Sequence, residues 1–268
     1  MFSPPPRSWL KMLAMAALLL AGACDDPPPQ AQPKEILAYI GITMAKPMAE
    51  IAAIVEERTG ASVIITQGGS EDLYQSLKAS RQGDLYMPGS ASYRDRHADE
   101  DLLGEFVHVG YNQAAFLVAK GNPKAVSGDP TQVLRRDLSI VVCNPESGSI
   151  GRETQRILSE ANVFNQAFER AQYLTTDSRN LNKALRNGEA DLILNWRATA
   201  FFSENRPAMD VVDFPPEVAQ PKKLLLNLLS FSENKDIARQ VMSVAASAEG
   251  QAIFRKYGFL DAKGLGDK

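Results

Sequence analysis

The sequence predicts an α/β protein with two doubly wound lobes, and three observations lead to this prediction. From residue 36 onward, short apolar runs alternate with amphipathic segments of helical period. The same alternation starts afresh at residue 138, which indicates a second unit. Polar turns rich in glycine and serine follow several of the predicted strands. A βαβαβ order with such turns is typical of a parallel sheet with helices on its faces.

Composition narrows the classes of function. The chain has 268 residues, 44% of them hydrophobic, which suits one or two domains with a sizeable core. Its net charge of -3 and the absence of a basic stripe argue against nucleic-acid binding. It contains only two cysteines and two histidines, so neither a disulfide framework nor a zinc site is expected. We predict no metal and no cofactor.

The N-terminal segment has the features of an export signal. Arg7 and Lys11 provide positive charge, and the apolar run from Leu10 to Ala23 is too short to span a membrane stably. The run ends in Leu-Ala-Gly-Ala followed by Cys24, which resembles the lipobox of bacterial lipoproteins. That resemblance implies a signal peptide at residues 1–23 and a lipid on Cys24. The alternative is a plain secretory signal in which Cys24 is incidental.

The next segment is predicted to be a tether. Residues 24–34 are rich in proline and glutamine and have little apolar content, so they cannot pack into a core. With a lipid at Cys24, the folded part would lie at the membrane surface outside the cytoplasm. Asp25 follows the cysteine, and an acidic residue there tends to keep enterobacterial lipoproteins on the inner membrane.

The predicted elements fall into two units along the chain. The first contains strands at 36–40, 62–66 and 84–88, helices at 46–59 and 71–81, and a solvated charged helix at 93–101. The second contains strands at 114–119, 138–143, 171–175 and 190–195, with helices at 152–160 and 179–187. A strand at 224–231 and helices at 235–247 and 248–257 close the fold.

Polar turns with free donors follow four of these strands. They lie at 42–43, 68–70, 147–151 and 177–179, with Ser70, Ser147 or Ser149, and Asp177 or Ser178 as candidate helix caps. Such turns meet at the carboxyl edge of a parallel sheet, where backbone N–H groups bind anions. The alternative for each turn taken alone is an ordinary capped connection between a strand and a helix.

Nothing in these turns indicates catalysis. They contain no histidine, no activated cysteine and no carboxylate pair, so they are suited to holding an anion rather than transforming it. Cys143 ends a buried strand and is interpreted as an inert core thiol. His97 and His108 lie in a polar stretch and are expected at the surface. We therefore predict a protein that is not an enzyme.

Several short motifs resemble those of one protein family. They are Lys-Gly-Asn-Pro at 120–123, Asn-Pro at 144–145 with Gly151, Asn-Gly-Glu-Ala-Asp at 187–191, and the closing segment 248–259. In this order they make residues 35–261 similar to the periplasmic molybdate-binding proteins of ABC importers. The resemblance implies the type II periplasmic-binding-protein fold, with a ligand cleft between two lobes. It implies lobe 1 at 35–114 and 215–268, and lobe 2 at 115–214.

The resemblance also implies a set of ligand-binding positions. Two hydroxyls, two backbone N–H groups and one aromatic side chain hold a tetrahedral oxyanion in this family. Transferred to this sequence, these positions with their neighbours are Thr43, Ser70, Ser149, Ile150, Ser178 and Trp196. The family has a tyrosine where this chain has Trp196, which donates only from its indole N–H. The alternative for Trp196 is packing within a lobe.

Arg197 is the last candidate. It directly follows Trp196, and in the cleft its guanidinium would add a charged, bidentate donor that a site of neutral dipoles does not need. The alternative is a salt bridge at the surface or at the hinge. A charged donor here would suit an anion different from, or larger than, molybdate.

The sequence thus predicts a monomeric, extracytoplasmic solute-binding lipoprotein. It would capture a small oxyanion similar to molybdate or tungstate and present it to the permease of an ABC importer. The alternative function uses the same fold as a sensor of another small organic or inorganic anion, signalling to a kinase or a chemoreceptor. Genes for a permease and an ATPase beside this one would favour transport.

Overall fold

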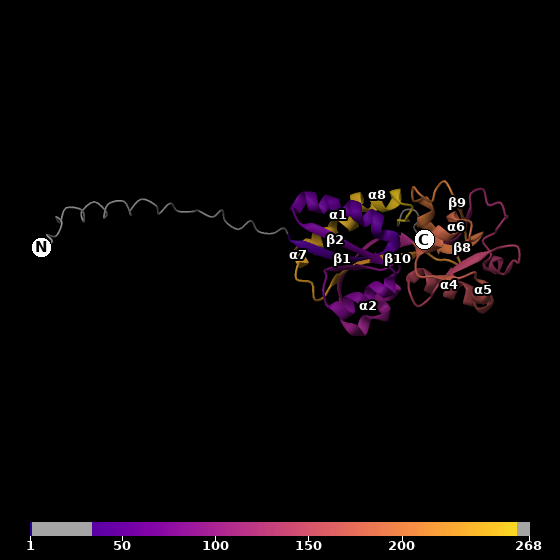
Figure 1. The fold of residues 1–268 in the computed structure, drawn as a ribbon, viewed down its shortest axis with the longest axis horizontal. Helices are drawn as coiled ribbons and strands as arrows, with labels where there is room; N and C mark the ends of the chain where they lie inside the picture. The colour runs from indigo at the N-terminus through magenta and orange to yellow at the C-terminus, as the bar shows by residue number, and fades with distance from the viewer. Residues whose placement is uncertain (2–33, 262–268) are drawn as a thin grey trace. The chain divides into compact units, whose positions relative to one another are not determined.

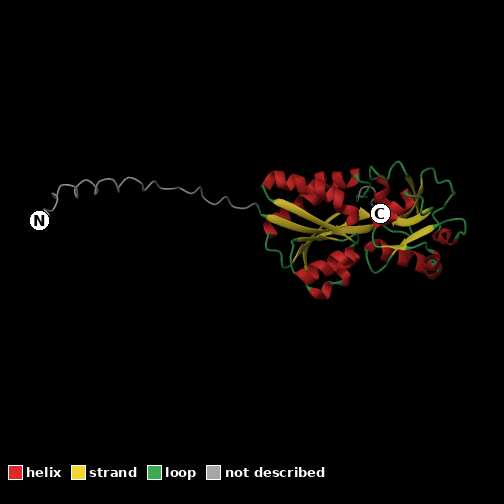
Figure 2. Cartoon of the chain, viewed as in Figure 1, coloured by secondary structure: helices red, strands yellow, loops and turns green. Residues whose placement is uncertain are grey.

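The computed structural model describes Met1 and residues 34–261. The predicted signal peptide, Cys24, Asp25 and almost all of the predicted tether lie outside the described residues. Within them the chain forms two five-stranded sheets with helices packed around each, which confirms the predicted α/β class with two lobes (Figures 1 and 2). No helix among the described residues is both long enough and apolar enough to cross a bilayer.

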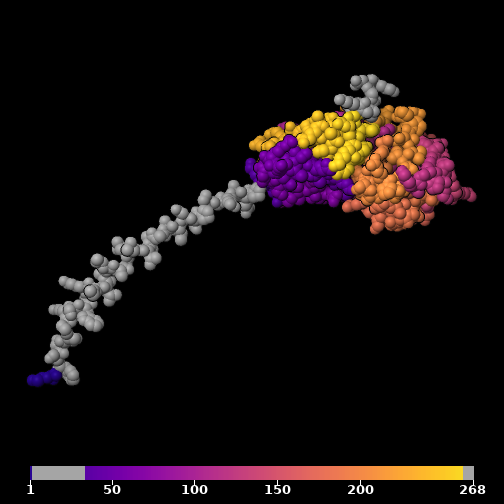
Figure 3. Space-filling view, turned by 90° about the horizontal axis from the view of Figure 1, so that it is seen from above, coloured from indigo at the N-terminus to yellow at the C-terminus, as the bar shows by residue number. Residues whose placement is uncertain are grey.

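Lobe 1 is the part of the chain built on the first sheet, whose strand order is β2-β1-β3-β10-β4. Its strands are β1 (Glu35–Gly41), β2 (Ser62–Gly68), β3 (Leu85–Met87), β4 (Leu103–Asn112) and β10 (Lys222–Leu229). Its helices are η1 (Ile42–Met44), α1 (Ala45–Thr59), α2 (Ser70–Ser80), α3 (Ser92–Arg96), η2 (Ala98–Glu100), α7 (Lys235–Ala246) and α8 (Ala248–Lys256). Figure 3 shows the indigo beginning and the yellow end of the folded chain together in this lobe.

Lobe 2 is built on the second sheet, whose strand order is β7-β6-β8-β5-β9. Its strands are β5 (Ala114–Ala119), β6 (Ile140–Cys143), β7 (Leu174–Thr175), β8 (Leu192–Trp196) and β9 (Met209–Asp213). Its helices are η3 (Pro130–Leu134), α4 (Ser149–Glu160), α5 (Phe164–Arg170), α6 (Ser178–Arg186) and η4 (Arg197–Phe201).

Both sheets are mixed, whereas a parallel sheet was predicted. β10 runs antiparallel to β3 and β4, and β5 runs antiparallel to β8 and β9. The reason is the way the chain passes between lobes. β5 is the first strand after the chain enters lobe 2, and β10 is the first after it returns to lobe 1. Neither strand is joined to its sheet partners by the helical crossover that a parallel pair needs.

The stretch at 93–101 also differs from the prediction. It forms α3 and η2, but it is not a solvated helix, because the side chains of Tyr93 and His97 are buried. The His97 ring stacks on Tyr74 with ring centroids 3.7 Å apart, so the prediction of a surface histidine was wrong. His108 is half-buried, and its Nε2 lies 2.9 Å from the carbonyl oxygen of Gly110.

Each lobe has its own apolar core, and two chain segments connect the lobes. In lobe 1, Ile36, Ile40 and Met48 are buried between the sheet and its helices. In lobe 2, Phe116 and Ile193 have the same role. The connections are Gln113 between β4 and β5, and residues 214–221 between β9 and β10. The side-chain amide of Gln113 donates to the carbonyl oxygen of Ala219 at 2.9 Å, so the two connections are joined.

Candidate functional site

Four strand ends meet at one small pocket between the lobes. β1 and β2 of lobe 1 lead into η1 and α2 there, while β6 and β7 of lobe 2 lead through short turns into α4 and α6. The strand-end pocket, as we name it, is lined by Gly41, Ile42, Thr43, Met44, Gly68, Gly69, Ser70, Gly89, Gly148, Ser149, Ile150, Thr176, Asp177, Ser178 and Trp196. The structure thus brings together six of the seven predicted site residues: Thr43, Ser70, Ser149, Ile150, Ser178 and Trp196.

The pocket is surrounded by the N-terminal ends of helices. Ser70, Ser149 and Ser178 are the first residues of α2, α4 and α6. The N–H groups of a first helical turn have no partner inside the helix, and the helix dipole makes this end positive. Three such ends, two from lobe 2 and one from lobe 1, therefore offer donors to a single anion.

The residues that precede these helices leave most of their donors free. Gly69 and Gly148 stand at the N-cap positions of α2 and α4, and neither helix has a side-chain cap. The predicted serine caps were therefore wrong. Ser147 instead donates to the carbonyl oxygens of Asn144 and Thr176, which stabilises the turn before α4. Only α6 is capped as predicted, because the Asp177 carboxylate accepts from the N–H of Asn180 at 2.9 Å.

Buried hydroxyl groups complete the donor set. The Ser70 Oγ accepts a hydrogen bond from the Gly89 N–H at 3.1 Å, which leaves the hydroxyl hydrogen of Ser70 available to a ligand. The Thr43 hydroxyl donates to the Ser178 Oγ at 3.4 Å, and this hydrogen bond links the two lobes. All of these donors are neutral dipoles.

Trp196 packs within lobe 2, which was its alternative interpretation, and it also lines the strand-end pocket. It ends β8, is 1% exposed and belongs to the apolar core of lobe 2. It also lines the strand-end pocket, where its Nε1 is 3.3 Å from the position that a Cβ on Gly89 would take. The same Cβ would lie 2.2 Å from the Ser149 Oγ, so only glycine at position 89 allows lobe 1 to approach so closely.

Arg197 lies away from the strand-end pocket. Its Nε donates to the Asp213 carboxylate at 3.0 Å, and its guanidinium carbon is 4.9 Å from the centre of the Phe201 ring. The side chain lines a separate open depression together with Arg206 and Lys256. The structure thus places Arg197 in the salt bridge that was its alternative interpretation.

The two lobes are in contact around the strand-end pocket. A Cβ on Gly69 would lie 2.3 Å from the carbonyl oxygen of Ser147 on the opposite lobe. The enclosed volume is about 10 Å³, which is about the volume needed for one water molecule. This is the geometry of a closed cleft.

Ion pairs between the lobes accompany this closure, and the sequence did not indicate them. Arg152 of α4 pairs with Glu71 of α2, and its Nε donates to the Tyr93 hydroxyl at 3.1 Å. Lys46 of α1 pairs with Glu204 at 2.6 Å. A cation in the first turn of α4 opposes the helix dipole, and this unfavourable position is the one local signal that Arg152 has a partner elsewhere.

The pKa values of several titratable groups at the site are shifted by burial and by neighbouring charges. Burial raises the pKa of Tyr93 to about 12, and the neighbouring Arg152 opposes that rise. Burial, followed by the charges of Glu71 and Asp177, raises the pKa of Asp72. Burial raises the pKa of the Cys143 thiol to about 12, so this thiol is protonated at neutral pH and is no nucleophile. Among the described residues, no group of histidine, cysteine, aspartate and glutamate side chains is arranged to hold a metal.

Two α/β lobes joined by two chain segments, with strand ends and helix N-termini facing each other across a closed cleft, form the type II periplasmic-binding-protein fold. The comparison with known families agrees: the chain belongs to the bacterial extracellular solute-binding protein family, whose model matches residues 36–260. The protein is therefore an extracytoplasmic binding component of the kind used by ABC importers. This finding confirms the predicted resemblance, and family members are binding proteins rather than enzymes.

Individual relatives are distant in sequence. The molybdate-binding protein ModA of Rhodobacter capsulatus is 20% identical over 230 residues, covering 84% of this chain and 88% of that protein. The periplasmic molybdate-binding protein of Azotobacter vinelandii has a similar fold, with a TM-score of 0.70, 14% identity, and coverage of 84% of this chain and 98% of that one. The sulfate-binding protein SubI of Mycobacterium tuberculosis gives a TM-score of 0.73 at 15% identity, covering 87% of this chain and 88% of that one.

Proposed function

We propose that this protein captures a small oxyanion of the molybdate or tungstate class and delivers it to the permease of an ABC importer. One observation carries the proposal. The N-terminal ends of α2, α4 and α6 surround a single pocket from opposite lobes. Within the described part of the chain, α2 and α4 have no side-chain cap, and α6 has one, at the Asn180 N–H. An oxyanion satisfies several first-turn N–H groups at once, because each of its oxygens accepts more than one hydrogen bond.

Neutral donors are sufficient to hold such an anion. A hydrogen bond to a charged partner contributes roughly 1.5–3 kcal/mol, about twice the contribution of a neutral pair. The Ser70 hydroxyl and the N–H groups of Ile150 and Ser178 are the donors we assign to the ligand, with the Thr43 hydroxyl and the Trp196 indole N–H beside them. The names of two relatives, which specify molybdate and sulfate, support this class of ligand.

Binding would be coupled to closure of the lobes. The two connections at Gln113 and at 214–221 act as the hinge in this proposal, and closure around a ligand is the usual motion of periplasmic binding proteins. The closed form, with the Arg152–Glu71 pair formed, would be the form that the permease recognises.

Attachment to the membrane is a separate part of the proposal. A lipid on Cys24 and the segment up to residue 34 would hold the lobes near the membrane that contains the permease. The support is the resemblance of residues 20–24 to a lipobox and the extracytoplasmic family to which the chain belongs.

A melting screen tests the ligand class. The purified full chain is heated with molybdate, tungstate, sulfate, phosphate or a small organic anion, and with neutral solutes as controls. A ligand that binds only the native state stabilises it by RT ln(1 + [L]/Kd), so the bound anion raises the melting temperature as its concentration increases. A flat response to every anion, with a shift for a neutral solute, would overturn the proposal.

A further inference from the structure

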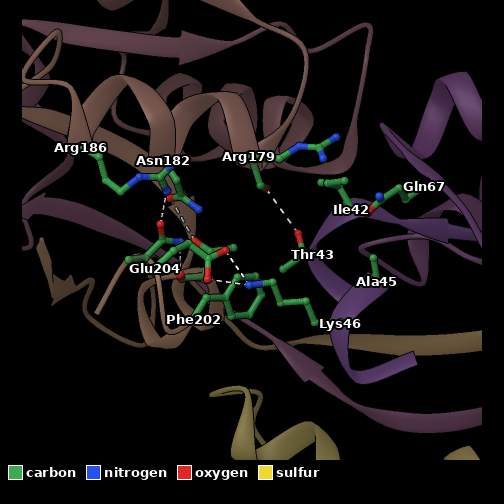
Figure 4. A pocket seen from close by; sticks show the side chains of 13 residues that line it. Ile42, Thr43, Ala45, Lys46, Gln67, Arg179, Asn182, Arg186, Phe202 and Glu204 are labelled. Carbon is green, nitrogen blue, oxygen red and sulfur yellow. Dashed lines mark hydrogen bonds and ion pairs between the residues drawn. The ribbon is translucent and has the colours of Figure 1, made fainter. Parts of the chain in front are cut away.

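A second cavity continues the cleft beyond the strand-end pocket. This side chamber has a volume of about 150 Å³ and lies between η1 and α1 of lobe 1 and α6 and η4 of lobe 2 (Figure 4). It shares Ile42, Thr43 and Ser178 with the strand-end pocket. The hydrogen bond between Thr43 and Ser178 therefore separates two compartments of one cleft.

The two compartments differ greatly in size. The strand-end pocket encloses about 10 Å³, whereas the side chamber encloses about 150 Å³. A cavity of roughly 150 Å³ accepts a molecule as large as benzene, whereas one of about 10–15 Å³ holds a single water molecule. A bare tetrahedral oxyanion among the helix ends would leave the side chamber unused. An anion that carries an organic extension would fill both.

The side chamber is positively charged. Three cations, Lys46, Arg179 and Arg186, line it against a single carboxylate, Glu204, which gives a net charge of +2. Lys46 is neutralised by Glu204, and Arg186 donates to the side-chain oxygen of Asn205. The Arg179 guanidinium has no hydrogen-bond or ion-pair partner within the described part of the chain. Figure 4 shows it extending from α6 toward the side of the cleft that carries Ile42 and Gln67.

The remaining walls suit a short carbon skeleton. Ile42, Ala45 and Phe202 provide apolar surface in the side chamber. Phe202 is held in place because it is buried against the core of lobe 1 and the Lys46 ammonium lies 4.9 Å from the centre of its ring. A ligand that spans the cleft would meet neutral donors in the strand-end pocket, and both apolar surface and a guanidinium in the side chamber.

From the different chemistry of the two compartments we infer that the ligand is a small organic dianion or trianion with a tetrahedral oxyanion at one end and a carboxylate at the other. The oxyanion end lies against the helix ends of the strand-end pocket, with the lobes parted slightly farther than in the closed structure, and the carboxylate lies in the side chamber against Arg179. The inference rests on the proposed function, because it names the ligand class for the same cleft. Arg179 is the specificity-determining residue for the second charge.

The experiment compares head groups with their extended counterparts. Binding of phosphate, 2-phosphoglycolate, sulfate and sulfoacetate to the purified full chain is measured by isothermal titration calorimetry. Glycerol 3-phosphate, which has a phosphate but an uncharged tail, separates the effect of size from that of charge. We expect 2-phosphoglycolate or sulfoacetate to bind at least about tenfold more tightly than its inorganic head group, the scale of one added charge-assisted hydrogen bond.

Arg179→Gln and Lys183→Gln form a matched pair of variants. Both replaced side chains are exposed cations on α6, but Lys183 does not line the side chamber. Arg179→Gln should weaken binding of the carboxylate-bearing anion about tenfold and change that of the inorganic head group by less than about threefold. Lys183→Gln should change neither by more than about threefold, the scale of a surface charge effect.

The possible results separate the two proposals. If no anion binds, the proposed function fails and this inference fails with it. If inorganic oxyanions bind as tightly as their carboxylate-bearing counterparts, the oxyanion function stands and the inference is overturned. A preference for the extended anion that survives in Arg179→Gln also overturns it, because the second charge would then be bound elsewhere.

Discussion

Replacing Gly69 with alanine should prevent the lobes from closing on a ligand. Gly69 has φ −63° and ψ 142°, a conformation that alanine adopts without strain. In the closed structure, however, the added Cβ would lie 2.3 Å from the carbonyl oxygen of Ser147, where real Cβ atoms are essentially never found within 3.0 Å. The opposing atom belongs to the main chain of lobe 2, so it cannot rotate away. Within lobe 1 the added Cβ would lie 2.9 Å from the Asp72 carboxylate oxygen, the end of a side chain that can shift. The substitution therefore mainly opposes the contact between the lobes.

The size of the effect follows from this overlap. Inserting one carbon into a close-packed contact costs typically about 1–3 kcal/mol. Because each 1.4 kcal/mol is a factor of ten in affinity, anion binding should weaken by roughly 5- to 150-fold. The free energy of unfolding of the ligand-free protein should not fall, since replacing glycine with alanine at a compatible position stabilises a protein by about 0.4–1 kcal/mol through its unfolded state.

The neighbouring glycine provides a matched control. A Cβ on Gly68 would meet only side-chain carbons of Leu73 at 3.5 Å, an ordinary contact within lobe 1. Titration calorimetry gives the affinity of each variant for the anion with the largest melting shift, and small-angle scattering with and without that anion reports closure. Gly68→Ala adds a methyl group beside the same pocket without touching lobe 2, so it should compact like the unmodified protein and lose less affinity than Gly69→Ala. If Gly69→Ala binds as tightly as Gly68→Ala and compacts equally, closure does not depend on this contact and the reasoning is refuted.

Three further outcomes are expected. Ser70→Ala should weaken anion binding roughly 10- to 100-fold, the scale of one hydrogen bond to a charged partner, whereas Arg197→Ala should change it by less than about threefold, because this guanidinium is paired outside the pocket. Equal, small losses in titrations of both variants would show that the ligand lies elsewhere. Arg152→Gln leaves the partly buried Glu71 without its partner across the cleft, so the melting shift produced by a saturating anion should shrink. An unchanged shift would remove Arg152 from the closure mechanism. Cys24→Ser should move the protein out of the membrane fraction without lowering its melting temperature, and unaltered fractionation would contradict lipidation.

Local sequence patterns predicted those helices and strands in which apolar residues recur at regular spacing. The amphipathic spacing at 46–59 predicted α1, and the helix predicted at 152–160 is found as α4, although α4 begins three residues earlier, at Ser149. β4 was missed because Gly104, Glu105 and Gly110 interrupt its apolar pattern, although its backbone pairs along β10. Its stability comes from this pairing with a distant strand, which no short stretch of sequence shows.

Some features of the candidate site were likewise predictable from the sequence, and others were not. The proximity of the two turns within each lobe was predictable, because the carboxyl ends of parallel strands meet at one edge of a sheet. That the two pairs face each other across a cleft came from the family resemblance. The pairing of Arg152 with Glu71 was not, because it joins residues 81 positions apart that meet only when the lobes are closed. The need for glycine at position 89 was also hidden, since it arises from Ser149 on the opposite lobe.

Arg179 and Arg197 show why adjacency in sequence does not place a charge in a cleft. Each directly follows a residue of the strand-end pocket, Ser178 in one case and Trp196 in the other. After Trp196 the chain continues as the short helix η4, and Arg197 faces Asp213 on a neighbouring strand. After Ser178 the chain continues as the longer helix α6, and Arg179 lies beside the side chamber with no hydrogen-bond or ion-pair partner among residues 34–261. The cation available to a ligand is therefore Arg179, at the N-terminal end of α6. Substituting Arg179 should change which anions bind, whereas substituting Arg197 should change only contacts outside the strand-end pocket.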